Sequence, residues 1–100
     1  MLNEEDFAGR VHIEIATLHV WLEEGWLLPL TVEQKPLFRD VDIARARLIQ
    51  DLSELMGVND EGIHVVLGLV DQLHAVRRDF DDLVSQIKSQ SLDLPGGGLR

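Results

Sequence analysis

The last third of the chain places the tightest limit on what this sequence can fold into. Asn59 can cap a helix, the acids Asp60 and Glu61 follow it, and no proline occurs from there until Pro95. This stretch predicts one helix that runs to about Ser89 and is on the order of 45 Å long. Such a helix is too long for a domain of 100 residues to cover. We therefore expect its second half to pack against another copy of the chain.

Apolar residues recur along this helix at alternating steps of three and four, which is the spacing of a coiled-coil seam. The series is Ile63, Val66, Val70, Leu73, Arg77, Phe80, Val84 and Ile87. We predict a homodimer, held by a dimeric antiparallel coiled coil. Its expected dimer seam consists of Val70, Leu73, Arg77, Phe80, Val84 and Ile87. The alternative is a helix that breaks near the sequence RRD, residues 77–79, and folds back.

Two short helices are expected before the middle of the chain. Asn3 can cap the first helix, which ends near Arg10. The second helix covers Glu14 to Glu24 and ends at Gly25. Its inward face is expected to be Ile15, Leu18, Trp21 and Leu22.

A hairpin and a third helix come next in the chain. Residues 26–30 and 35–39 form two short extended runs, and the proline in each suits the edge of a small hairpin better than a central strand. The third helix opens at Asp40 or Asp42 and stops at Gly57. Its expected apolar face is Val41, Ala44, Leu48, Leu52 and Leu55.

These elements predict a mainly α-helical fold. It is a winged helix-turn-helix, made of short helices and a small β-hairpin wing, followed by a long C-terminal helix. We expect a winged-helix-like core over residues 1–58, a long helix over 59–90 that packs on the core and dimerises, and a flexible tail over 91–100. In this plan the second helix enters the major groove of DNA, and the wing contacts the DNA backbone.

The charge of the chain conflicts with that use of the fold. Eighteen acidic residues outnumber nine Lys plus Arg, so the formal net charge is −9. The second helix contains no Lys or Arg and offers phosphates only His19. A surface of this kind repels DNA and attracts a basic protein.

No chemical motif points to an enzyme. The chain has no cysteine, and His12, His19, His64 and His74 do not make the paired spacing of a zinc site. The glycines near the C-terminus lack the strand and helix that a phosphate loop needs. We predict no catalytic residues, no metal and no cofactor. The acidic start and the lack of a long apolar run favour a cytoplasmic protein.

Two stretches resemble a known family. The sequence LHVWLEEGWLLP, residues 18–29, resembles the second helix, glycine and proline of MerR-type regulators, and residues 38–63 resemble the segment after their wing. More narrowly, the chain is similar to the CbpM family of chaperone modulators over residues 6–87. The features that carry this similarity are the acidic wing, Leu52-Ser53-Glu54-Leu55, and Gly62-Ile63 leading into the long helix.

The second resemblance implies a protein partner. CbpM-type proteins bind the J-domain of a CbpA/DnaJ-type co-chaperone and inhibit its co-chaperone and DNA-binding activities. A J-domain meets its DnaK-type chaperone through a basic helix, which an acidic modulator could cover. The residues expected to face the partner are Asp51, Glu54, Asp60, Glu61 and Asp71.

Two other functions stay open at this point. The chain could be a MerR-like transcription regulator that lacks an effector domain and binds DNA as a dimer. Arg39, Arg45 and Arg47 would then form a small basic patch near the base of the wing. It could also be a dimerisation adaptor with another client.

Overall fold

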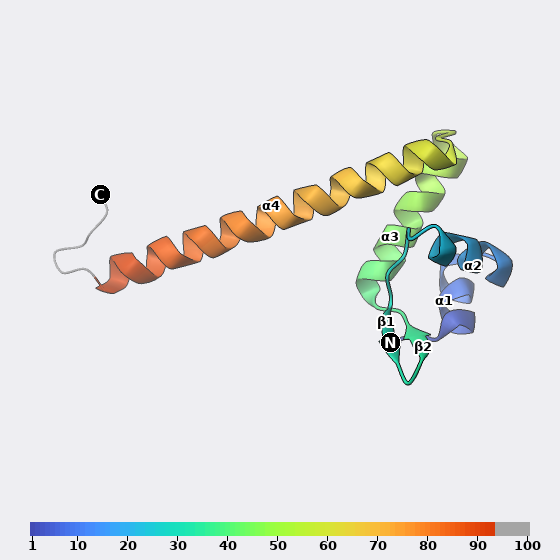
Figure 1. The fold of residues 1–100 in the computed structure, drawn as a ribbon, viewed down its shortest axis with the longest axis horizontal. Coiled ribbons are helices and arrows are strands. Elements are labelled where there is room, and N and C mark those ends of the chain that lie inside the picture. Colours follow the sequence, from blue (N-terminus) through green and yellow to red (C-terminus); the bar gives the residue numbers. More distant parts are fainter. Residues whose placement is uncertain (94–100) are drawn as a thin grey trace. The chain divides into compact units, whose positions relative to one another are not determined.

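The structure is a computed structural model that describes residues 1–93, with side chains up to Gln90. The fold is mainly helical, with one small hairpin and a long C-terminal helix, as predicted (Figure 1). The chain divides into two compact units, Met1–Val65 and Val66–Arg100, and each is described by itself. The flexible tail was predicted over residues 91–100, of which 94–100 lie outside the described part.

Helix α1, Glu4–Val11, begins as its sequence predicts. The Asn3 side-chain oxygen accepts a hydrogen bond from the backbone N–H of Asp6 at 2.8 Å. Three acids occupy the first turn, where the helix dipole favours negative charge. The helix buries Phe7, Ala8 and Val11 and ends at His12, which has a left-handed backbone with φ of 60°.

Helix α2, Ile15–Glu23, also lies where it was expected. Leu18 and Trp21 are buried, whereas Ile15 in the first turn is 37% exposed and Leu22 is half-buried. The buried stripe is therefore narrower than predicted. Gly25 ends the helix with φ of +75°, a conformation that suits glycine.

The wing is a two-stranded antiparallel hairpin, β1 Leu30–Val32 and β2 Lys35–Leu37. The first strand begins later than predicted because Trp26 still belongs to the helix end, where its N–H donates to the carbonyl of Trp21 at 3.0 Å. At the tip of the hairpin, Glu33 and Gln34 both have positive φ, 51° and 66°. A two-residue turn of this kind matches the twist of the strands but favours Asn and Gly.

The core of the first unit forms around two stacked phenylalanines. The rings of Phe7 and Phe38 lie 4.1 Å apart with an interplanar angle of 15°. The backbone of Phe38 also exchanges two hydrogen bonds with Leu2, so the chain after the wing is tied to the N-terminus. The other large side chains that are fully buried are Leu18, Leu27, Ile49 and Ile63. These contacts hold α1, α2, the wing and the third helix in one unit.

Helix α3, Asp40–Gln50, buries a different face from the predicted one. Val41 is 62% exposed, Ala44 is exposed and Leu48 is only half-buried. The buried residues are Asp42, Ile43, Ala46 and Ile49. The prediction of this face was wrong because two apolar series share the helix. The position of α3 is decided by contacts made far away in sequence, such as the Gln50 Nε2 that donates to the carbonyl of Val11 at 2.7 Å.

The third helix ends in a π-helix, η1, over Asp51–Leu55. Leu52 stays buried, as predicted, but Leu55 is 79% exposed. The wide turn puts one extra residue into the helix, and Met56 N–H consequently donates to the carbonyl of Asp51 at 3.1 Å. Leu55 continues the series of Val41, Ala44 and Leu48, which this helix does not bury.

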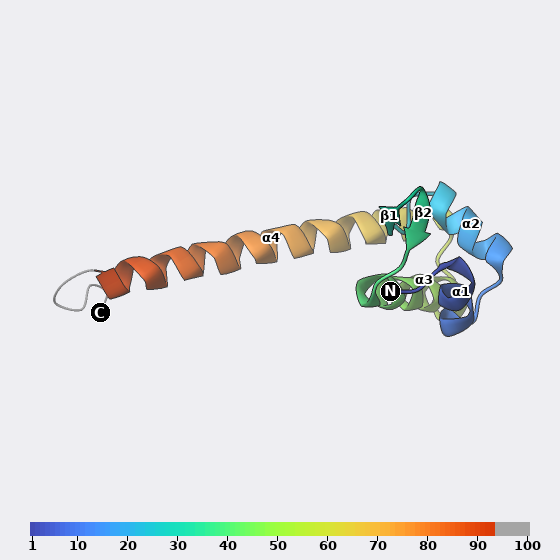
Figure 2. The same ribbon diagram turned by 90° about the horizontal axis from the view of Figure 1, so that it is seen from below.

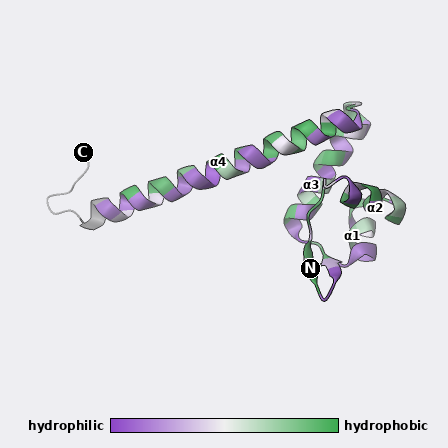
Figure 3. Ribbon diagram, in the orientation of Figure 1, coloured by the Kyte–Doolittle hydropathy of each residue, from purple (hydrophilic) through white to green (hydrophobic). Residues whose placement is uncertain are grey.

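Helix α4, Asp60–Asp93, is continuous, so the alternative of a break near residues 77–79 was wrong (Figure 2). Asn59 caps it as predicted, because its side-chain oxygen accepts from the N–H of Gly62 at 2.8 Å. The helix runs past the predicted end near Ser89. Hydrophobic and hydrophilic residues alternate along it (Figure 3).

Candidate functional site

The outer face of α2 is the surface that a helix-turn-helix presents to DNA. Its exposed residues include Val20, which is 50% exposed, and Glu23. His19, the one basic side chain of this helix, has its Nε2 atom 3.1 Å from an oxygen of Glu4. The face is therefore apolar and acidic, and its histidine is held by a carboxylate.

Two of the three arginines that could form a basic patch hold the backbone instead. Arg39 Nη2 donates to the carbonyl of Leu28 at 3.3 Å, and Arg45 Nε donates to the carbonyl of Trp26. We call these two contacts the arginine clamp. The clamp fixes the segment before the wing to α3, and Arg47 is left as the exposed member of the patch.

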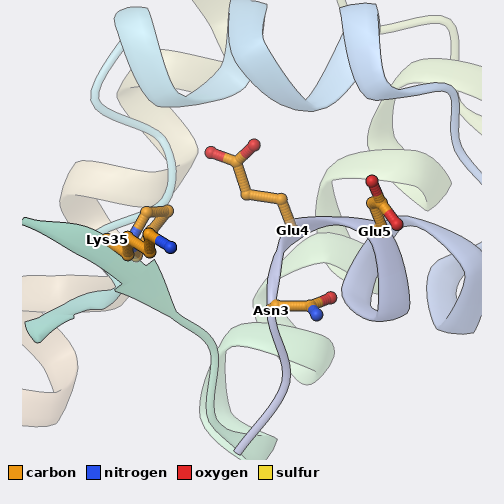
Figure 4. A pocket seen from close by; sticks show the side chains of 5 residues that line it. Asn3, Glu4, Glu5 and Lys35 are labelled. Atoms are coloured by element: carbon orange, nitrogen blue, oxygen red, sulfur yellow. The ribbon is translucent and has the colours of Figure 1, made fainter.

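The wing adds no positive surface. Lys35 on β2 lines a hollow of about 390 Å³ together with Asn3, Glu4, Glu5 and Pro36 (Figure 4). The tip of the wing carries Glu33. The carboxylates of Glu4 and Glu5 thus line the same hollow as Lys35. This part of the molecule therefore does not offer phosphates a net positive surface.

Four of the five acids predicted to face a partner belong to the first unit. Asp51 and Glu54 are exposed on η1, and Asp60 and Glu61 are exposed in the first turn of α4. Asp71 is also exposed but belongs to the second unit. The structure thus places four exposed acids on the two elements that are joined by residues 56–59, a place that we call the corner.

The structure adds a further acid that sequence reasoning missed. Glu24 joins Asp60, Glu61, His64 and Val65 around an open hollow of about 450 Å³. Glu24 is the C-cap of α2, where the negative end of the helix dipole disfavours a carboxylate. The sequence signal that could have indicated Glu24 is the pair of successive glutamates, Glu23 and Glu24, at the C-terminus of this helix.

Two apolar residues at the same corner were also missed as surface groups. Leu55 is 79% exposed, and Met56 is 69% exposed. Helical periodicity predicted Leu55 on the buried face of the third helix. Leu55 is exposed because the third helix buries the other apolar series, that of Ile43, Ala46 and Ile49.

Most of the predicted dimer seam is uncovered in the second unit. Leu73 and Phe80 are 65% and 63% exposed, Ile87 is 40% exposed, and Arg77 is exposed. Val70 and Val84 are half-buried. Neighbouring apolar residues widen the uncovered stripe: Leu69, Val76 and Leu83.

Neither a metal site nor a membrane span is found among the described residues. In residues 1–90 no three His, Asp or Glu side chains come together as metal ligands. None of the helices in residues 1–93 has the length and apolar content needed to cross a membrane.

The three short helices, the hairpin and the long helix define a helix-turn-helix protein with a small wing. Residues 5–68 match the family model described as MerR HTH family regulatory protein. Because this match covers more than half of the chain, the chain belongs to the MerR family. Membership points to a regulator and not to an enzyme. No curated protein and no solved structure matches the chain significantly.

Proposed function

We propose that this MerR-family protein is a cytoplasmic chaperone modulator of the CbpM type. It binds the J-domain of a CbpA/DnaJ-type co-chaperone through an acidic surface and inhibits the co-chaperone and DNA-binding activities of that partner. The acidic surface consists of Asp51, Glu54, Asp60 and Glu61, with Asp71 on the second unit.

The observation that carries this proposal is the composition of the surface that would grip DNA. Helix α2 has no Lys or Arg, and its His19 is paired with Glu4. The arginine clamp uses Arg39 and Arg45 to hold carbonyl oxygens. A DNA-binding protein needs cations or free backbone amides for each phosphate contact. The family fold is therefore present here with a surface better suited to a basic protein.

The proposed inhibition is a competition for one helix. The J-domain uses a basic helix to meet its DnaK-type chaperone, and the four corner acids offer that helix complementary charge. While the modulator covers the basic helix, the chaperone cannot reach it. Charge attraction also speeds the encounter, so binding should weaken as salt rises.

We also propose that the protein acts as a homodimer. The uncovered stripe on α4 would pack against the same stripe of a second copy in an antiparallel coiled coil. The seam is Val70, Leu73, Arg77, Phe80, Val84 and Ile87. Sedimentation at micromolar concentration tests this: the wild-type chain should be a dimer, and Phe80→Asp should be a monomer. A monomeric wild type would refute the dimer.

The function is tested by titrating J-domains and DNA in parallel. We expect a J-domain to bind and Asp51→Lys with Glu54→Lys to weaken its binding at least tenfold, about 1.4 kcal/mol. The matched control is Glu5→Lys with Glu33→Lys, which makes the same change in charge on α1 and the wing and should leave the affinity within about twofold. Circular dichroism should show unchanged helicity in both.

Two outcomes of these titrations would contradict the proposal. If no J-domain binds while promoter DNA does, and the DNA binding fades steeply with salt, the chain is a transcription regulator. If both lysine pairs weaken J-domain binding equally, the effect comes from net charge and not from the corner acids.

A further inference from the structure

The corner between η1 and α4 carries an adjacent pair of exposed large apolar side chains. Leu55 and Met56 are 79% and 69% exposed, although they directly precede the turn at Gly57. A single exposed leucine is ordinary on a protein surface, but two neighbouring large apolar groups form the beginning of an apolar patch. Val65 on α4, 60% exposed, belongs to the same unit.

Leu55 lies at the end of the π-helix, beyond Leu52, the last buried residue of the third helix. It continues the apolar series of Val41, Ala44 and Leu48, which α3 does not bury, because the helix buries Ile43, Ala46 and Ile49 instead. The wide turn is closed by Met56 N–H to Asp51 O at 3.1 Å and by Val58 N–H to Leu52 O at 2.8 Å. Wide turns of this kind are rare and occur frequently at functional sites.

Carboxylates flank the apolar pair along the chain. Asp51 lies one turn before Leu55, Glu54 directly precedes it, and Asp60 and Glu61 open the next helix. None of these four side chains forms a hydrogen bond or an ion pair with the described residues. Their charges therefore remain available to a partner. An apolar pair flanked by acids is complementary to an amphipathic helix that carries an apolar side chain between basic ones.

We infer that Leu55 and Met56 are the apolar anchors of the partner interface, and that they receive an apolar side chain from the basic helix of the partner. This inference rests on the proposed function and names the contact within it. The carboxylates then govern the rate of encounter and the orientation of the helix, while burial of the anchors governs how slowly the complex dissociates. Methionine suits this position because its flexible side chain adapts to the shape of the surface that it covers.

The test compares serine substitutions at exposed apolar positions. Leu55→Ser with Met56→Ser should weaken J-domain binding at least tenfold in titration calorimetry and leave its salt dependence unchanged, because no charge is altered. The matched control is Val20→Ser with Leu28→Ser. It removes two exposed apolar groups, 50% and 66% exposed, from α2 and the segment before the wing. Its affinity should stay within about twofold of the wild type.

The outcomes separate this inference from the function on which it rests. If the wild-type chain binds no J-domain, the proposed function fails. If it binds and the Leu55/Met56 pair behaves like the control pair, the function stands and the anchors are refuted. If the Leu55/Met56 pair instead converts a dimer into a monomer in sedimentation, the corner is a contact between copies, which also refutes the inference. Because both positions are exposed, the variants should fold with wild-type helicity.

Discussion

Removal of the Asp42 carboxylate should destabilise the first unit substantially. The residue is 3% exposed, and its Oδ2 atom accepts two hydrogen bonds from Arg39, at 2.8 Å from the backbone N–H and at 3.3 Å from Nε. The backbone contact satisfies an N–H at the start of α3, and the loss of such a helix-end bond costs about 1 kcal/mol. The side-chain contact contributes less, about 0.5 kcal/mol, because the Arg39 side chain is 38% exposed and solvent screens the pair.

The sum predicts that Asp42→Ala lowers the free energy of unfolding by about 1.5 kcal/mol. For a chain of this size that corresponds to a fall in Tm of about 6 to 12 °C. Thermal denaturation followed by circular dichroism measures it. The control is Asp40→Ala, an exposed acid in the same helical turn, which should cost only about 0.3–1 kcal/mol through the helix dipole. Equal losses for the two variants would show that the contacts of Asp42 with Arg39 contribute nothing specific.

Two further substitutions test the wing and the core. Gln34→Gly should raise the Tm by a few degrees. Gln34 has φ of 66°, and this left-handed conformation costs a residue with a side chain about 1 kcal/mol, which glycine avoids. An unchanged or lower Tm would contradict this. Phe38→Ala should lower the free energy of unfolding by about 3–5 kcal/mol, because it removes a fully buried ring that is stacked on Phe7. Val32 on β1 is 48% exposed, so Val32→Ala should lower it by well under 1 kcal/mol. Urea denaturation compares the two, and similar midpoints would refute the placement of Phe38 in the core.

Much of the fold follows from local signals in the sequence. Asn3 and Asn59 cap the helices that they were predicted to cap, and Gly25 ends α2 with the positive φ expected of it. The uninterrupted stretch after Asn59 predicted α4, which is continuous. These features depend on neighbours within one or two helical turns, so a single sequence contains the information needed to predict them.

The buried face of α3 could not be predicted in this way. Val41, Ala44 and Leu48 have good helical spacing, but so do Ile43, Ala46 and Ile49, and the sequence does not rank the two series. The choice is made by distant groups, namely the arginine clamp to the segment before the wing and the contact of Gln50 with Val11. A long-range contact of this kind has no local signature.

The candidate site was predictable only in part. The acids at 51, 54, 60 and 61 were expected on the surface because charged residues next to helix ends are usually exposed, and they are exposed. Glu24 was missed because it approaches Asp60 and Glu61 from another element. Leu55 was missed because it belongs to the apolar series of Val41 and Leu48, and the helix buries the other series.

The arginine clamp has a consequence for how such a scaffold can change its use. Arg39 and Arg45 reach main-chain oxygens of Leu28 and Trp26, and every amino acid supplies the same oxygen at those positions. The attachment of the wing therefore does not depend on which side chains the wing carries. Mutations can reverse the charge of the outer surface without loosening the architecture. A helix-turn-helix scaffold can in this way change the partner that it suits one surface residue at a time.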